Sequence, residues 1–336
     1  MRTLRALLIL ALAAACAPAQ TLRIFAIDVE GGKSTLYVSP SGESMLVDTG
    51  YAGNNGRDAN RIAAAAASAG VKRIDYLVIT HYHGDHAGGV PQLAAKLPIG
   101  KIFDHGDSFE QSNQKTLDMF QTFAAVRAKY PHQTLHPGDM IPIKGLRVDI
   151  VGGAGKAIAS PLAGAGQPNP LCSSHEALPP DPGENALSLA MIITFGGLRI
   201  ADLGDLYWNQ EHALVCPNNK LGVVDLYMTT HHGTATSGPP EIVHALHPRV
   251  AIMNNGADKG GSVKAWTTIE KSPGLEDLWQ LHFSNEGGKD HNVAESFIAN
   301  LSGEKDAGYS IQVVARADGL FTVRNGRNRF EKTYRK

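Results

Sequence analysis

The chain has 336 residues, 43% of them hydrophobic, so it is long enough to bury a substantial core as one large domain. Its 31 lysines and arginines nearly balance its 32 aspartates and glutamates, which gives a formal net charge of −1. The charges are spread along the sequence without a basic block or an acidic tail. This distribution excludes a strong nucleic-acid footprint, although it is compatible with a local basic groove.

The first nineteen residues are predicted to be a secretory signal peptide. Arg2 and Arg5 precede an apolar stretch at 6–15, and Ala17-Pro18-Ala19 provides the small residues that a signal peptidase recognises. We therefore expect cleavage between Ala19 and Gln20 and a periplasmic or secreted protein. The alternative is a lipoprotein, anchored through Cys16.

The mature chain, residues 20–336, is predicted to be a single domain without a membrane span, because no later segment approaches ~20 uninterrupted apolar residues. Cleavage after Ala19 leaves two cysteines, Cys172 and Cys216. In an oxidising compartment these two residues either pair or remain as buried thiols, and the sequence supports both alternatives equally.

Short β-branched apolar runs predict strands, and apolar residues at helical spacing predict helices. The predicted strands are 22–29, 34–38, 44–48, 74–79, 101–103, 140–143, 146–151, 187–195, 198–201, 223–229, 249–253, 309–315 and 320–324. The predicted helices are 60–69, 90–96, 112–129, 209–215 and 239–246. Residues 152–183 are rich in Gly, Ala, Pro and Ser, and we expect a long loop that either borders the active site or is a disordered insertion.

One decapeptide carries most of the functional information. Residues 80–89 read Thr-His-Tyr-His-Gly-Asp-His-Ala-Gly-Gly and directly follow the strand predicted at 74–79. His81 and His83, two positions apart, can face one point, while Asp85 and His86 face another. Imidazole and carboxylate ligands suit zinc, iron or manganese better than calcium or magnesium. The decapeptide is therefore predicted to be a metal-binding loop.

The pattern His-x-His-x-Asp-His after a strand resembles the metallo-β-lactamase superfamily. Three further motifs follow the superfamily order: Val47-Asp48-Thr49-Gly50, Leu203-Gly204-Asp205 and Thr230-His231-His232-Gly233. The resemblance spans about residues 22–260. It implies an α/β fold, the αββα sandwich of two mixed β-sheets packed face to face with helices outside. It also implies one or two metal ions, with zinc expected and manganese or iron as alternatives.

The resemblance also implies a role for each motif residue. The implied metal ligands are His81, His83, Asp85, His86, Asp205 and His231. Asp85 and Asp205 are the residues expected to take part in catalysis, with Asp205 bridging two metals. His231 is preferred to His232 as a ligand because it directly follows the threonine that ends a predicted strand. The residues expected to support the ligands or to touch the substrate are Asp48, His105, Asn185 and His232.

The chain departs from the common superfamily pattern at the third ligand of the first metal. Where many members carry a Gly-His motif, this sequence has Pro180–Asn185 without a histidine. His105 and His175 are candidate substitutes, and ordinary structural roles are the alternative for both.

Residues 28–36, Glu184–Leu189 and His231–Thr234 resemble the extracytoplasmic domain of competence-type DNA-uptake proteins, in which an asparagine motif replaces Gly-His. A later Gly-His-Pro motif of that branch is absent here. The branch implies phosphodiester cleavage.

The function expected from these motifs is an exported metal-dependent hydrolase that uses a metal-activated water. A phosphodiester or related ester substrate, small or polymeric, is slightly favoured. A β-lactam, lactone or thioester hydrolase of the same fold is the alternative. A non-catalytic binding protein that has lost full metal occupancy is a further alternative, and a di-iron oxidoreductase is disfavoured because no flavin-binding domain follows.

Overall fold

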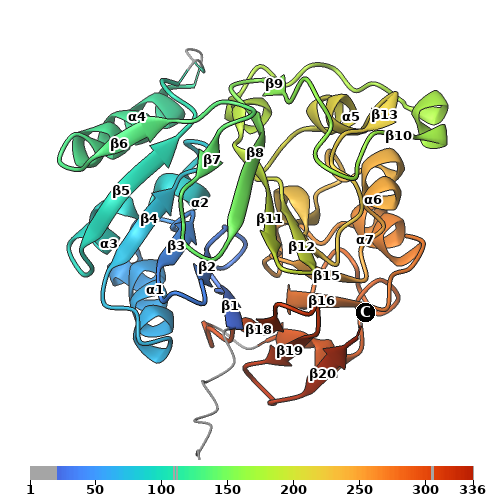
Figure 1. Cartoon of the computed structure of the whole chain (residues 1–336). Helices are drawn as coiled ribbons and strands as arrows, with labels where there is room; N and C mark the ends of the chain where they lie inside the picture. The colour runs from blue at the N-terminus through green and yellow to red at the C-terminus, as the bar shows by residue number, and fades with distance from the viewer. Residues whose placement is uncertain (1–20, 109, 111–112, 304–305, 336) are drawn as a thin grey trace, which may run out of the picture.

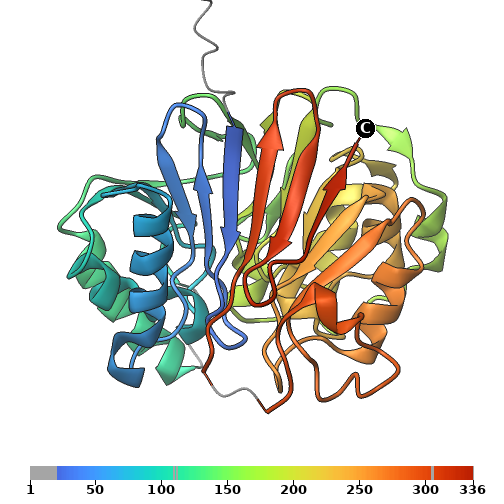
Figure 2. The same ribbon diagram turned by 90° about the horizontal axis from the view of Figure 1, so that it is seen from below.

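A computed structural model describes residues 21–108, 110, 113–303 and 306–335. The predicted signal peptide, including Cys16, lies outside these residues. Two large β-sheets pack face to face, and helices cover the outer side of each sheet (Figure 1, Figure 2). The αββα sandwich predicted from the sequence is therefore confirmed. No helix in the described ranges is long and apolar enough to cross a membrane.

The first sheet has nine strands in the order β20-β19-β18-β1-β2-β3-β4-β5-β6. Its strands are β1 (Thr21–Ala26), β2 (Thr35–Val38), β3 (Ser44–Val47), β4 (Ile74–Val78), β5 (Ile99–Asp104), β6 (His132–Thr134), β18 (Ile311–Arg316), β19 (Phe321–Asn325) and β20 (Glu331–Tyr334). Its outer face carries α1 (Arg57–Ser68), α2 (Gly84–Ala87), α3 (Val90–Ala94) and α4 (Gln114–Arg127). Three of its strands come from the C-terminal end of the chain, because β1 pairs antiparallel with β18.

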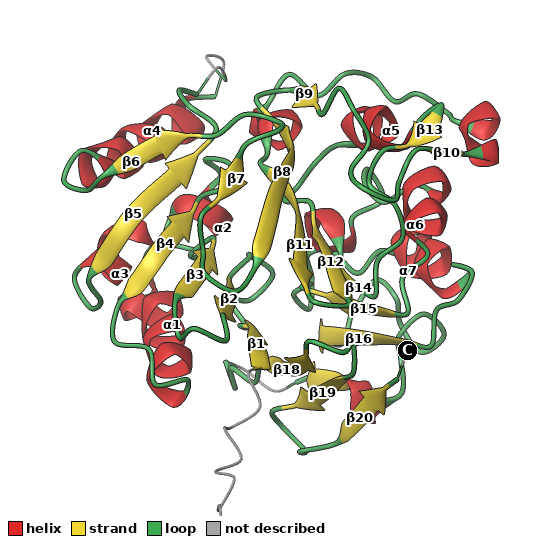
Figure 3. Cartoon of the chain, viewed as in Figure 1, coloured by secondary structure: helices red, strands yellow, loops and turns green. Residues whose placement is uncertain are grey.

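The second sheet has the order β17-β16-β15-β14-β12-β11-β8-β7, with β9 paired to β8 (Figure 3). Its strands are β7 (Met140–Ile141), β8 (Arg147–Gly153), β9 (Lys156–Ala157), β11 (Ala190–Phe195), β12 (Leu198–Asp202), β14 (Leu226–Met228), β15 (Val250–Met253), β16 (Asp277–His282) and β17 (Ile298–Asn300). Helices α5 (Trp208–Val215), α6 (Pro240–Leu246) and α7 (Val263–Glu270) cover its outer face. A separate two-stranded ribbon joins β10 (Gln167–Pro168) to β13 (Asn218–Asn219).

Three apolar clusters correspond to the three contacts between the four layers. The central cluster lies between the sheets and joins residues such as Ile24 and Val47 of the first sheet to Ile193 and Ile200 of the second. The other two clusters fill the space between each sheet and its own helices. Strands buried on both faces read as continuous apolar runs, which is why the sequence indicated most of them.

The structure contains elements that the sequence did not predict. These are the strands β6, β9, β10, β13, β16, β17 and β20 and the helices α2 and α7. The predicted loop at 152–183 is described over its full length and contains β9, β10 and a short 3₁₀ helix at Pro170–Ser174.

A buried ion pair connects the two sheets. Lys33, in the turn between β1 and β2, pairs with Asp202 at the end of β12, and the side chains of the two residues are 1% and 0% exposed. The hydroxyl of Tyr37 donates a second hydrogen bond to Asp202, with an O–O distance of 2.9 Å. Burial alone would lower the pKa of Lys33, but the charges of Asp202 and Asp48 hold it above its ordinary value. The lysine is therefore charged and fully compensated.

We predict that Lys33→Met lowers the free energy of unfolding by about 3–5 kcal/mol, because it leaves the Asp202 carboxylate buried without its cation. Urea denaturation measures the change. Lys144→Met is the matched control, since Lys144 is 79% exposed and pairs with Glu43 at the surface. Its expected effect is below about 1 kcal/mol. Equal effects of the two substitutions would contradict the prediction.

Candidate metal centre

The predicted metal loop leaves β4 at the carboxyl end of the strand. His83 is the N-cap of α2, so Asp85 and His86 lie in the first turn of this short helix. His81 and His86 are fully buried, and their rings lie 4.1 Å apart. The rings of His81 and His83 lie 4.7 Å apart. The loop therefore gathers its three histidines at one point.

Asp48, directly after β3, holds the histidine loop through hydrogen bonds to Thr80 and His86. One carboxylate oxygen accepts the Thr80 backbone N–H at 2.8 Å, and the other accepts the Thr80 hydroxyl at 2.7 Å. The second oxygen also lies 2.7 Å from Nδ1 of His86. This contact places the His86 proton on Nδ1, because a carboxylate only accepts hydrogen bonds. The Nε2 lone pair of His86 is then free to bind a metal.

Four buried ligand-type side chains from both sheets converge at this point. They are Asp85, His86, Asp205 and His232, and their ligand atoms all lie within 4.8 Å of one another. Oδ2 of Asp205 lies 3.1 Å from Nε2 of both His86 and His232. Oδ2 of Asp85 lies 3.3 Å and 3.1 Å from the same two nitrogens.

The charges of this cluster suit a metal ion. Burial would raise the pKa of both Asp85 and Asp205, but the neighbouring histidines hold both values well below the ordinary range, so both are carboxylates. Oδ1 of Asp205 is buried and makes no hydrogen bond within the described part of the chain. Two carboxylates and two imidazoles form a ligand set typical of zinc, iron and manganese. The residues present therefore fit such an ion.

His81 and His83 lie beside this cluster as a pair. Nε2 of His81 and Nδ1 of His83 are 3.0 Å apart. Nδ1 of His81 lies 3.3 Å from the Ser188 hydroxyl, and Nε2 of His83 lies 3.4 Å from the Glu110 carboxylate. Among the residues that the structure describes, no third His, Cys, Asp or Glu forms a close cluster with this pair.

The two histidines of the last motif occupy the reverse of the expected positions. His232 joins the buried cluster, whereas Nε2 of His231 stands 3.8 Å from Asp205. The physical reason is the backbone, because both residues have left-handed φ values, 52° and 56°. This turn leaves His232 in the buried cluster and His231 beside it, with a side chain that is 14% exposed.

The remaining candidates lie at different depths. His105 is buried behind the loop, with Nε2 2.8 Å from Glu184 and its ring 4.5 Å from Tyr82. It therefore belongs to the support of the loop and does not face the ligand cluster. The amide nitrogen of Asn185 lies 3.4 Å from Nε2 of His231, at the edge of the site. His175 lies away from the centre, against Glu241.

Sequence reasoning missed Glu184, which ties three segments together. Its carboxylate accepts the Tyr82 backbone N–H at 3.2 Å and the Ser108 hydroxyl at 2.5 Å, in addition to its contact with His105. The only signal was its position next to Asn185 in the motif that had been singled out.

The ammonium group of Lys259 pairs with Asp85 and lies 3.5 Å from the Tyr51 hydroxyl. The turn that carries Lys259 is fixed over His232, whose carbonyl accepts the Gly261 N–H at 2.9 Å. Its charge therefore stands at the edge of the ligand cluster.

The long segment 152–183 begins at the end of β8 and leads to Glu184 and Asn185 beside the metal centre. Cys172 and Cys216 form a disulfide, which is one of the two alternatives left open by the sequence.

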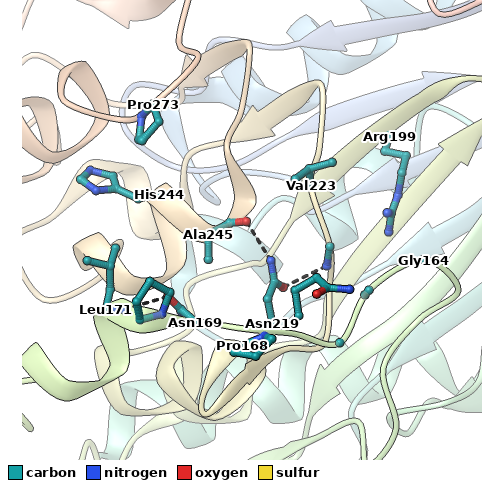
Figure 4. A pocket seen from close by; sticks show the side chains of 15 residues that line it. Gly164, Pro168, Asn169, Leu171, Arg199, Asn219, Val223, His244, Ala245 and Pro273 are labelled. Carbon is teal, nitrogen blue, oxygen red and sulfur yellow. Dashed lines mark hydrogen bonds between the residues drawn. The ribbon is translucent and has the colours of Figure 1, made fainter.

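A cavity of about 500 Å³ lies under the segment, lined by Pro168, Leu171 and His244 among others (Figure 4). None of its lining residues belongs to the ligand cluster, so this cavity is separate from the metal centre.

Comparison with known proteins identifies the proteins that this chain resembles. Residues 27–157 match the model of the metallo-beta-lactamase superfamily. ComE operon protein 3 of Bacillus subtilis is 27% identical over 191 residues, covering 56% of this chain and 20% of that protein. Competence protein ComA of Neisseria gonorrhoeae is 23% identical over 231 residues, covering 68% of this chain and 26% of that protein. The predicted resemblance to the competence-type branch is confirmed.

A shorter match joins the chain to ribonuclease Z of Alkaliphilus oremlandii, with 36% identity over 71 residues, or 21% of this chain and 20% of that protein. Each of these three alignments covers about a quarter or less of the relative's own length.

A buried glutamate supports the turn that carries the last motif. Glu211 on α5 is fully buried and accepts the Gly238 N–H at 2.6 Å. The neighbouring Ser237 hydroxyl lies 2.9 Å from Nδ1 of His231. Burial raises the pKa of Glu211 to about 8.

We predict that Glu211 makes stability depend on pH. The folded state keeps this proton up to about pH 8, whereas an unfolded glutamate releases it near 4.5. The contribution of Glu211 is therefore fully present below about pH 4.5 and is lost as the pH rises towards 8. Glu211→Gln should gain unfolding free energy relative to the wild type across this range, measured by urea denaturation. The exposed Glu176→Gln is the control, and parallel pH profiles for wild type and Glu211→Gln would contradict the prediction.

Proposed function

We propose that this chain, a member of the metallo-β-lactamase superfamily, is a metal-dependent hydrolase. The observation that carries the proposal is the buried cluster of Asp85, His86, Asp205 and His232, in which one oxygen of Asp205 has no hydrogen-bond partner within the described residues. Ions held there supply Lewis acidity and lower the pKa of water towards neutrality. Zinc is the ion proposed, with manganese or iron as alternatives.

Each ligand has a definite proposed place. His81 and His83 would hold one ion, because Nε2 of His81 and Nδ1 of His83 lie 3.0 Å apart. Asp85, His86 and His232 would hold the other ion, and the family pattern implies that Asp205 would serve both. The ligand role expected for His231 passes to His232.

His231 is proposed to contact the substrate. The Ser237 hydroxyl donates to the Leu206 carbonyl at 2.8 Å, so it accepts the Nδ1 proton of His231. Burial also lowers the pKa of His231 to about 4, so the ring is neutral at neutral pH. Its Nε2 lone pair therefore lies beside the Asn185 amide and is able to accept a hydrogen bond from a bound substrate.

A phosphodiester is the substrate class proposed. Lys259 places a positive charge beside Asp85, and the Tyr51 hydroxyl lies next to the ammonium group. An anionic substrate oxygen bound beside Lys259 would therefore meet an ammonium group and a hydroxyl donor. The likeness to ribonuclease Z supports the same class. A lactam, lactone or thioester hydrolase remains the alternative. A non-catalytic binding protein is the alternative favoured by one observation: among the described residues, no third His, Cys, Asp or Glu clusters closely with His81 and His83.

A periplasmic or secreted location is proposed from two observations. The first is the signal-like segment before residue 20. The second is the disulfide between Cys172 and Cys216, since such bonds persist mainly in oxidising compartments.

We predict that the purified protein binds metal and hydrolyses bis-p-nitrophenyl phosphate in a chelator-sensitive manner. His83→Ala should lower turnover more than about 100-fold, because it removes a proposed ligand. The exposed His136→Ala is the control, and circular dichroism checks the fold of each variant. Metal-free protein without chelator-sensitive turnover on this diester or on nitrocefin would refute the enzyme. Full turnover by His83→Ala would refute the ligand assignment.

We predict that Lys259→Met lowers kcat/KM for the anionic diester about 10-fold, through loss of one charged hydrogen bond. The same variant should hydrolyse the neutral ester p-nitrophenyl acetate as the wild type does. Metal analysis of the variant separates this effect from loss of the ion. An equal loss on both substrates would mean that Lys259 does not recognise substrate charge.

A further inference from the structure

A second group of ligand-type side chains lies outside the metal centre, where segment 152–183 crosses the outer helices. His175 follows the 3₁₀ helix at Pro170–Ser174, His212 lies on α5, and Glu241 lies on α6. Their ligand atoms lie within 4.8 Å of one another. The Glu241 side chain is 2% exposed, and the side chains of His175 and His212 are 13% and 28% exposed. The group is therefore partly enclosed but reachable from solvent.

The contacts within this group leave one nitrogen without a partner. Nδ1 of His175 bonds Oε1 of Glu241. Nδ1 of His212 lies 3.7 Å from the same oxygen, beyond hydrogen-bond distance, and this buried atom makes no hydrogen bond to any residue that the structure describes. The two imidazole rings are stacked with centroids 3.8 Å apart. A buried polar atom without a partner costs free energy unless a further group satisfies it.

A third group with ligand-type atoms shows a useful contrast. Asp28, Glu30 and His282 also gather within 4.8 Å. There the Arg61 guanidinium already pairs with both Asp28 and Glu30. Its acidic charge is met by the protein itself, whereas no lysine or arginine is paired with Glu241 among the described residues.

We propose that His175, His212 and Glu241 form a second metal site, for a divalent zinc-type cation. Two imidazole nitrogens and one carboxylate oxygen are a ligand set used by zinc, with an open position for water. The site would be distinct from the Asp85–Asp205 centre and does not depend on the proposed hydrolase activity. Its role would be structural, fastening segment 152–183 to α5 and α6.

The disulfide prepares this site. Cys172 lies three residues before His175, and Cys216 lies four residues after His212. The covalent bond therefore holds the two histidine-bearing segments together before any ion binds, which lowers the conformational entropy lost on binding. Asn169 adds a further tie, because its amide donates to the Glu241 carbonyl at 2.8 Å.

The segment held in this way continues to the metal centre. After His175, the Leu178 carbonyl accepts the Asn209 amide at 2.7 Å, and the chain then reaches Glu184 and Asn185. Glu184 bonds the backbone of the histidine loop, and Asn185 contacts His231. A cation at the second site would thus steady the segment that leads into Glu184 and Asn185 at the first.

Zinc titration of the full oxidised chain tests the proposal. The His83→Ala/Asp85→Ala/His86→Ala variant removes proposed ligands of both ions at the metal centre, and we expect it to retain about one zinc ion per chain. Adding His175→Ala and His212→Ala should abolish that binding, whereas adding the exposed His136→Ala should leave it unchanged. Absence of zinc binding in the His83→Ala/Asp85→Ala/His86→Ala variant, or binding that survives the further loss of His175 and His212, would overturn the site.

A second measurement covers the case in which the combined variants fold poorly. In the otherwise native chain, His212→Ala should lower the zinc content by about one ion without changing the far-ultraviolet circular dichroism spectrum. Zinc should also slow proteolysis within 152–183 in the wild type and not in His212→Ala. A plain ion pair between His175 and Glu241 predicts equal zinc content and equal proteolysis rates, and that result would refute the proposal.

Discussion

The ion pair between Lys33 and Asp202 is the constraint on which the arrangement of the site depends. It joins a turn of the first sheet to the last residue of β12 with both side chains excluded from water. The Lys33 backbone also reaches the histidine loop, because its N–H donates to the Asp85 carbonyl at 3.0 Å. Asp205 follows Asp202 by three residues. One lysine therefore sets the position of ligands from both sheets, and a metal centre shared between two layers needs such a fixed reference.

The backbone carries part of the cost of this centre. Asp48, His231 and His232 all have positive φ, which non-glycine residues adopt at a cost of order 1–3 kcal/mol each. Each is held by specific contacts: Asp48 by Thr80, His231 by its N–H to the Gly204 carbonyl at 3.1 Å, and His232 by Gly261. Strain of this kind gathers at positions that must aim a side chain. The three residues are a ligand (His232), the residue proposed to contact the substrate (His231) and the support of the histidine loop (Asp48).

Local pattern predicted the elements that local pattern controls. The αββα architecture, the histidine loop and Asp205 were all readable, because apolar strands and clustered ligands are signals within a few residues. β16 was not predicted, since its buried polar residues Gln280 and His282 have partners outside the strand, at Asn292, 12 positions away, and at Asp28, 254 positions away. Long-range contacts also decided which residues at the metal centre were not predicted.

The exchange of His231 and His232 and the roles of Glu184 and Lys259 depend on tertiary contacts that leave no mark on the neighbouring sequence. A left-handed turn at the end of β14 is decided by what packs against it, and an ion pair between Lys259 and Asp85 joins residues 174 positions apart.

The pairing of β1 with β18 has a consequence for how the molecule is assembled. Thr21 lies opposite Arg316, so the first sheet closes only when strands from the two ends of the chain meet. Contacts of such high sequence separation form slowly, because closing the long loop costs entropy before the contacts can stabilise the chain. Until residues 311–334 are available, β1 has a free edge of the kind that promotes association between chains. During synthesis the chain is thus expected to stay unfolded, or to be bound by chaperones, until strands β18, β19 and β20 have been made.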